Sequence, residues 1–159
     1  MLIWFAVLSM LMVAAVFRSP TIDHRFVVAG SLLPLAEVAV GGPRLLHSVV
    51  GAVGVLVAVV LATTQRRLAR RRLLGIPIGL MCHLVLDASF TRTDVFWWPV
   101  TGTAFAGGQI PEVSHWTISV VLELLGVAAA VWAWRRFGLA EPTRRRQLLR
   151  DGRLDLPSA

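Results

Sequence analysis

Two groups of polar residues lie at the ends of apolar segments, where ionisable side chains are costly and are usually functional. His47 opens one apolar run, and His83 and Asp87 lie near the end of the next run. Residues four apart share one face of a helix, so His83 and Asp87 can bind one divalent ion, or the aspartate can orient the histidine. With His47 they would form the two-histidine, one-carboxylate set of catalytic zinc and related ions. This chemistry requires that both groups reach the same face of a membrane.

The composition is typical of a membrane protein. Hydrophobic residues make up 56% of the 159 residues, charged residues 16%, and the mean hydropathy is +0.70. All sixteen basic residues are arginine, with five in the segment 65–72 and seven from residue 135 onward. Arginine at the ends of apolar runs indicates cytoplasmic loops of a membrane protein. The net charge of +7 therefore does not predict a nucleic-acid partner.

Five apolar runs predict an all-α integral membrane protein with about five transmembrane helices in a compact bundle. A span needs about 20 residues, within a range of about 17–25. The second run is short and contains Gly30 and Pro34, so it could be a broken or re-entrant segment. The expected spans, within a transmembrane domain of residues 1–137, are about 2–17, 26–40, 45–64, 73–90 and 116–134.

The arginine distribution also predicts the orientation of the bundle. The loop 65–72 and the tail 138–159 should be cytoplasmic, and the N-terminus should lie outside. We expect the basic tail to lie on anionic lipid headgroups, each arginine adding about 1 kcal/mol. Interfacial tryptophans agree with this frame, with Trp97, Trp98 and Trp116 on the outer side.

This topology brings both histidine groups to the outer face and adds further candidates. Glu37 lies near the outer end of the second run, and Arg44 lies at the mouth, where its planar guanidinium could hold an anionic group such as a phosphate. Trp98 is a candidate to contact the same substrate. Glu123 lies at about the depth of His83, roughly 10 Å below the outer boundary at 1.5 Å per residue. An acid at that depth should pair with His83, His47 or Arg44, and Glu37 or Glu123 would complete the site or act as its base.

Three short elements, in this order and spacing, resemble the bacterial membrane-bound metal-dependent hydrolase family, the YdjM-like inner-membrane proteins. They are Gly30-Ser-Leu-Leu-Pro34-Leu-Ala-Glu37, Pro43-Arg44-Leu-Leu-His47-Ser48, and Gly79-Leu-Met-Cys-His83-Leu-Val-Leu-Asp87 followed by Trp97-Trp98-Pro99. The resemblance covers about residues 30–100. It implies a multi-pass protein of the bacterial inner membrane, with a divalent metal ion, zinc or manganese, held by His47, His83 and Asp87. The sequence departs from the family at Leu35 and Pro43, where the family has an aspartate and a histidine.

Two functions from different classes follow from these residues. The first is a metal-dependent hydrolase-like protein that acts on a lipid or lipid-linked phosphate at the extracytoplasmic face. The second is a non-catalytic accessory or scaffolding subunit, in a homo-oligomer or larger membrane complex, whose polar cluster fastens the helices together. The two missing family positions favour the second. An integral-membrane lipid phosphatase also uses an H-x-x-x-D element, but the other motifs of that class are absent from the sequence.

Overall fold

The computed structural model describes residues 1–17, 22–41, 45–100, 102 and 116–154, and these residues form helices and no strand. The predicted all-α class is confirmed. The second apolar run forms one unbroken helix of 18 residues, although Pro34 lies inside it. The helices are α1 (Leu2–Phe17), α2 (His24–Gly41), η1 (Leu45–His47), α3 (Val49–Ala62), α4 (Arg67–Leu73), α5 (Gly75–Leu86), η2 (Ser89–Thr91), α6 (Thr93–Phe96), α8 (Trp116–Arg136) and α9 (Pro142–Asp151).

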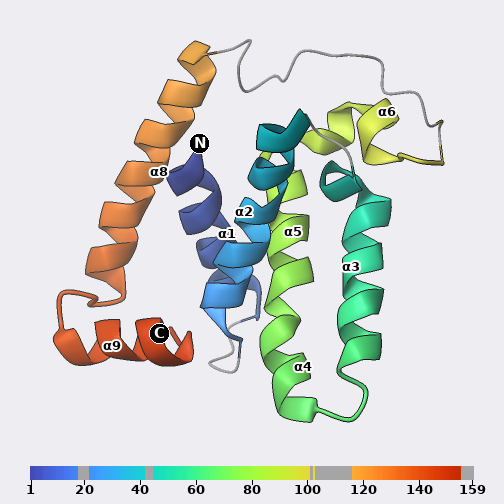
Figure 1. The fold of residues 1–159 in the computed structure, drawn as a ribbon. Helices are drawn as coiled ribbons and strands as arrows, with labels where there is room; N and C mark the ends of the chain where they lie inside the picture. The colour runs from blue at the N-terminus through green and yellow to red at the C-terminus, as the bar shows by residue number, and fades with distance from the viewer. Residues whose placement is uncertain (18–21, 42–44, 101, 103–115, 155–159) are drawn as a thin grey trace.

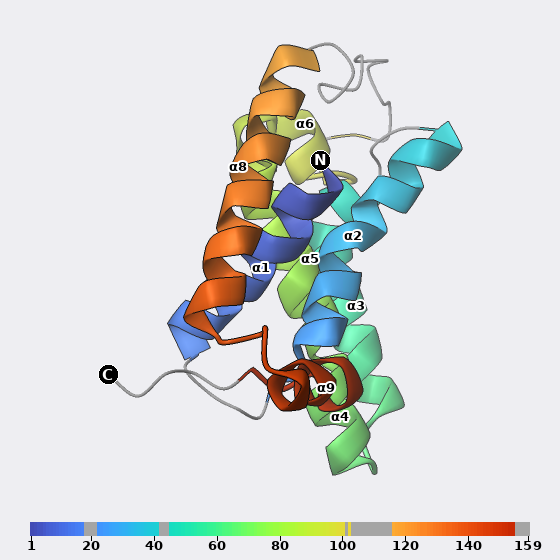
Figure 2. The ribbon, with the colours of Figure 1, turned by 90° about the vertical axis from the view of Figure 1, so that its left-hand side faces the viewer.

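Five helices lie roughly along one axis, and the chain direction alternates from each to the next (Figure 1). They are α1, α2, α3, α5 and α8. Helix α1 contacts α2, α5 and α8, while α3 packs on the far side of α5. The short α4 and the C-terminal α9 lie at one end of the bundle, and α6 and the N-terminus lie at the other (Figure 2). The two arginine-rich segments therefore share one end, as their positions in the sequence predict.

Much apolar surface stays exposed on this bundle. Helix α8 is long and apolar enough to cross a membrane, and it buries only Gly126 and Ala133 among its 21 residues. The apolar helices α1 and α3 are shorter, with 16 and 14 residues. Leu124 of α8 is 64% exposed and Leu61 of α3 is 69% exposed. Side chains of this kind are normally buried against another apolar phase.

The backbones of α2 and α5 touch because glycines lie at their contact. A Cβ atom added to Gly79 would lie 2.0 Å from the carbonyl oxygen of Val27, and one added to Gly30 would lie 2.1 Å from that of Ile76. Small residues allow helices to approach this closely in membrane-type bundles. The contact brings the C-terminal half of α5, which carries the predicted histidine and aspartate, against the middle of α2.

The C-terminal segment is tied to the bundle. The backbone N–H of His24 donates to the carbonyl of Gly152 at 2.9 Å, and the guanidinium of Arg25 donates to the carbonyls of Leu149 and Arg150. Leu154 is buried in a cluster formed by α1, the end of α8 and the turn that follows it. The tail predicted to rest on headgroups is therefore docked through residues 149–154, and its contact with lipid stays a prediction.

Replacing Gly79 by alanine should destabilise the protein by about 1–3 kcal/mol, because an added methyl group forces α2 and α5 apart. The unfolding midpoint of the purified protein, followed by circular dichroism, measures this effect. Gly54→Ala in α3 is the matched control, since a Cβ there meets nothing within 4 Å. It should be neutral or stabilising by up to about 1 kcal/mol, from helix propensity alone. Equal destabilisation by both changes would contradict this packing.

Candidate metal centre

Three predicted residues come together in the structure. His47, His83 and Asp87 each offer one ligand atom, and these atoms all lie within 4.8 Å of one another. The two imidazole rings have centroids 5.4 Å apart and are nearly perpendicular, at 85°. Both histidines are buried and the aspartate is half-buried. Residues from η1, from α5 and from the end of α5 thus form a group that could hold a metal ion, which the sequence predicted.

His83 presents one ring nitrogen that lacks a partner. Its Nδ1 lies 2.7 Å from the carbonyl oxygen of Ser31 in α2. A carbonyl only accepts, so Nδ1 is the protonated nitrogen and Nε2 carries the lone pair of the neutral ring. This Nε2 is buried and forms no hydrogen bond. Phe5 stacks against the ring with centroids 4.0 Å apart. A buried unsatisfied polar atom costs about 1–3 kcal/mol, so Nε2 is suited to a ligand.

His47 is oriented by a carboxylate on the neighbouring helix. Its Nδ1 lies 3.2 Å from Oε2 of Glu37, which also accepts from the backbone N–H of Leu46 at 3.0 Å. This arrangement leaves Nε2 of His47 for a ligand. A carboxylate behind a metal-binding histidine fixes the ring and raises its basicity. Glu37, predicted to complete the site or act as its base, therefore contacts His47 from behind and lies outside the group of three residues that could hold an ion.

The turn that carries His47 is held by Ser48, the N-cap of α3. The Ser48 hydroxyl donates to the carbonyl of Leu45 at 2.8 Å and accepts from the N–H of Gly51 at 2.9 Å. A serine N-cap satisfies one of the free N–H groups at a helix start. Gly51 is needed here, because a Cβ would lie 1.9 Å from the carbonyl oxygen of Leu45. Ser48 and Gly51 thus fix the turn that carries His47 relative to the start of α3.

Asp87 lies at the C-terminal end of α5 with two polar neighbours. Its Oδ2 accepts a hydrogen bond from the hydroxyl of Ser89 at 2.7 Å, and the guanidinium of Arg92 lies 3.8 Å from the same oxygen. The side chain of Arg92 is 33% exposed, whereas that of Asp87 is 9% exposed. Neither Ser89 nor Arg92 was a predicted site residue. The sequence signal that could have indicated Arg92 is its position five residues after Asp87, just beyond the apolar run.

Among the described residues Glu123 does not join the cluster, which corrects the pairing with a histidine expected from its depth. Its carboxylate accepts hydrogen bonds from the backbone N–H groups of Ile3, at 3.1 Å, and Trp4, at 3.3 Å. The first N–H groups of a helix have no partner within the helix and attract negative charge. Glu123 of α8 therefore caps α1, which stands between α8 and the cluster.

Two other predicted site residues have different outcomes. Arg44 lies outside the described residues. Trp98 is half-buried and follows α6 at the same end of the bundle as the cluster. Its role in binding a substrate stays a prediction.

Comparisons of the chain with family models, with curated protein sequences and with solved structures give no match.

Replacing Glu37 by glutamine should weaken zinc binding by about tenfold, the lower end of the 10–100-fold range for partners of metal ligands. Glutamine can still accept from Nδ1 of His47 but removes the negative charge. A zinc titration against a chelating dye measures the affinity. Glu141→Gln, at an exposed position, is the matched control and should leave the affinity unchanged. Unchanged affinity in the Glu37 variant would show that this carboxylate does not support the site.

Proposed function

We propose that this chain is a multi-pass protein of the bacterial inner membrane with a metal-dependent hydrolase-like site at its extracytoplasmic end. Its substrate would be a lipid or a lipid-linked phosphate. The observation that carries the proposal is the group His47, His83 and Asp87, whose ligand atoms lie within 4.8 Å of one another. Nε2 of His83 is in addition buried without a hydrogen-bond partner.

The membrane part of the proposal is supported by surface and charge. Leu124 on α8 and Leu61 on α3 belong to a larger set of exposed apolar side chains, and hydrocarbon would cover them. Helix α4, with three arginines in its last turn, and the arginine-rich α9 share one end of the bundle. By the positive-inside rule this end is cytoplasmic, and the metal centre lies toward the opposite end. Five spans are proposed, and among the described helices α8 alone is both long and apolar enough to cross a membrane.

The donor set fits a divalent ion such as zinc or manganese. Two imidazole nitrogens and one carboxylate leave an open position, which is the pattern of catalytic rather than structural zinc sites. A bound ion of this kind would activate water at neutral pH. His47, His83 and Asp87 would hold it. The Glu37 carboxylate and the Ser31 carbonyl would keep the two Nε2 atoms directed into the site.

A phosphate-containing substrate is favoured by Arg92. Its guanidinium lies 3.8 Å from the Asp87 carboxylate and is partly exposed. Guanidinium groups bind phosphate oxygens in a planar, two-pronged geometry. Arg92 would therefore hold an anionic group beside the ligand Asp87, the role predicted for Arg44 from the sequence.

The scaffolding alternative has its own support. His83 bonds to Ser31 of α2 and stacks on Phe5 of α1, so this side chain joins three helices. The two roles make different predictions for the same substitution. A purely structural histidine would be needed for stability and would not be needed for metal binding.

His83→Ala should abolish stoichiometric zinc binding while the protein remains folded. Zinc content after exposure and desalting measures the first property, and the unfolding midpoint measures the second. His24→Ala is the control, because His24 is also buried but lies at the opposite end; it should retain zinc.

Wild-type protein loaded with zinc or manganese should also release phosphate from vesicles containing dioleoyl phosphatidate.

Three outcomes separate the two functions. A wild-type protein that takes up no zinc or manganese, with a His83 variant that fails to fold, supports the scaffold. A His83 variant that binds zinc as the wild type does contradicts the assigned site. Zinc binding without phosphate release keeps the site but contradicts phosphatidate as its substrate.

A further inference from the structure

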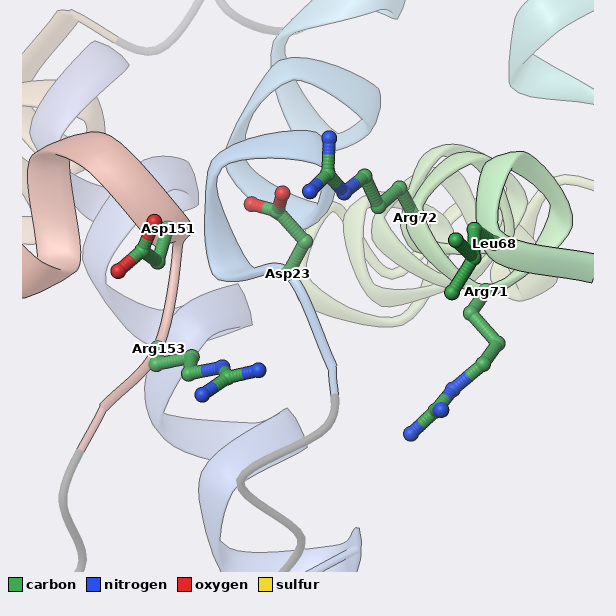
Figure 3. A pocket seen from close by; sticks show the side chains of 6 residues that line it. All are labelled: Asp23, Leu68, Arg71, Arg72, Asp151 and Arg153. Atoms are coloured by element: carbon green, nitrogen blue, oxygen red, sulfur yellow. The ribbon is translucent and has the colours of Figure 1, made fainter.

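A second polar site lies at the end of the bundle that carries α4 and α9. A hollow of about 230 Å³ there is lined by residues from three separate segments. In Figure 3, Arg71 extends from the α4 side and Arg153 extends from the segment after α9, while Arg72 lies near Asp23. The remaining lining residues are Leu68 and Asp151.

The charges around this hollow do not balance. Asp23 is paired with Arg25, whose guanidinium lies 2.7 Å from its carboxylate. Burial raises the pKa of Asp23, but the hydrogen bonds and charge of Arg25 outweigh it, so that the pKa lies below its ordinary value. Within the described part of the chain, Arg71, Arg72 and Arg153 form no ion pair. The charge of Arg72 acts on Asp23. Counting Arg25 with the lining residues, four guanidinium groups stand against the two carboxylates of Asp23 and Asp151, an excess of two positive charges.

Arg153 lines the hollow, and the residues before and after it are both held in place. Gly152 has a φ of 67°, and a Cβ there would lie 1.7 Å from Oδ1 of Asp23. The Gly152 carbonyl accepts from the N–H of His24 at 2.9 Å. On the other side, Leu154 is buried at 2% exposure. The backbone of Arg153 is therefore held in place before any ligand binds, which lowers the entropic cost of binding.

We propose that this hollow binds a phosphate group, carried either by an anionic lipid headgroup or by a small phosphate. Guanidinium groups bind phosphate oxygens through charge-assisted, two-pronged hydrogen bonds. Arg71 and Arg153 approach from opposite sides and can contact one phosphate together. The arginines of α4 and α9 around the hollow add an attractive field for anions. This site is separate from the proposed metal centre and does not depend on it.

The test compares two probes in micelles of a neutral detergent. Purified full-length protein is titrated with dioleoyl phosphatidate added to the micelles and, separately, with inorganic phosphate, with dioleoyl phosphatidylcholine as the uncharged reference. Calorimetry measures the affinities. The variant is Arg71→Gln with Arg153→Gln. The control is Arg145→Gln with Arg146→Gln, which removes the same charge from exposed positions on α9.

The variant should weaken binding by about tenfold or more, the loss expected for charge-assisted hydrogen bonds, and the control should weaken it less than about threefold. Binding of both probes supports a phosphate site, and binding of phosphatidate alone supports a lipid-headgroup site. Equal weakening in the variant and the control would overturn the proposal, because it indicates a general surface field. Binding of neither probe would also overturn it. If the double variant does not fold, Arg71→Gln alone on the exposed α4 should show the same selective loss.

Discussion

The backbones of α2 and α5 meet at Gly30 and Gly79, and this close approach places His83 against the carbonyl of Ser31. The Nδ1–H group donates a hydrogen bond to this carbonyl at 2.7 Å. Nε2 of the same ring is buried without a hydrogen-bond partner. A larger residue at either glycine would separate the helices and weaken this bond. The chemistry of the cluster therefore depends on helix packing one turn below it. Phe5 stacks on a face of the same ring, with the two centroids 4.0 Å apart.

The helices and the central cluster could be predicted from the sequence because both follow from residue order. Apolar runs bounded by arginine give the succession of helices and the end at which each one starts. His83 and Asp87 share a helix face through their spacing alone, and His47 joins them once neighbouring helices run in opposite directions. The number of residues from the membrane boundary, however, predicts only how far along its helix a residue lies. It does not predict the direction in which the side chain points. Glu123 was misplaced for this reason, since α1 stands between α8 and the cluster and provides its own N–H groups.

Other features depend on contacts that the local sequence pattern does not contain. Glu37 lies near the site as expected. The turn of η1 brings Nδ1 of His47 to its carboxylate, so Glu37 contacts a member of the group that could hold an ion. Arg92 lies beyond the apolar run, and the turn after α5 brings it back to Asp87. The charge of the C-terminal tail predicts contact with lipid but does not predict that the tail docks on the bundle. Its docking depends on Gly152 and Leu154, two inconspicuous residues in a run dominated by arginine.

We propose that His47, His83 and Asp87 together form one metal site. X-ray absorption spectroscopy of the zinc-loaded protein tests it most directly, because imidazole ligands give a characteristic multiple-scattering signal. A zinc ion held by these three residues should show two imidazole nitrogens at about 2.0–2.1 Å and oxygen ligands at about 2.0–2.2 Å. Fewer than two imidazoles, or a sulfur shell at about 2.3 Å from the buried Cys82, would contradict it.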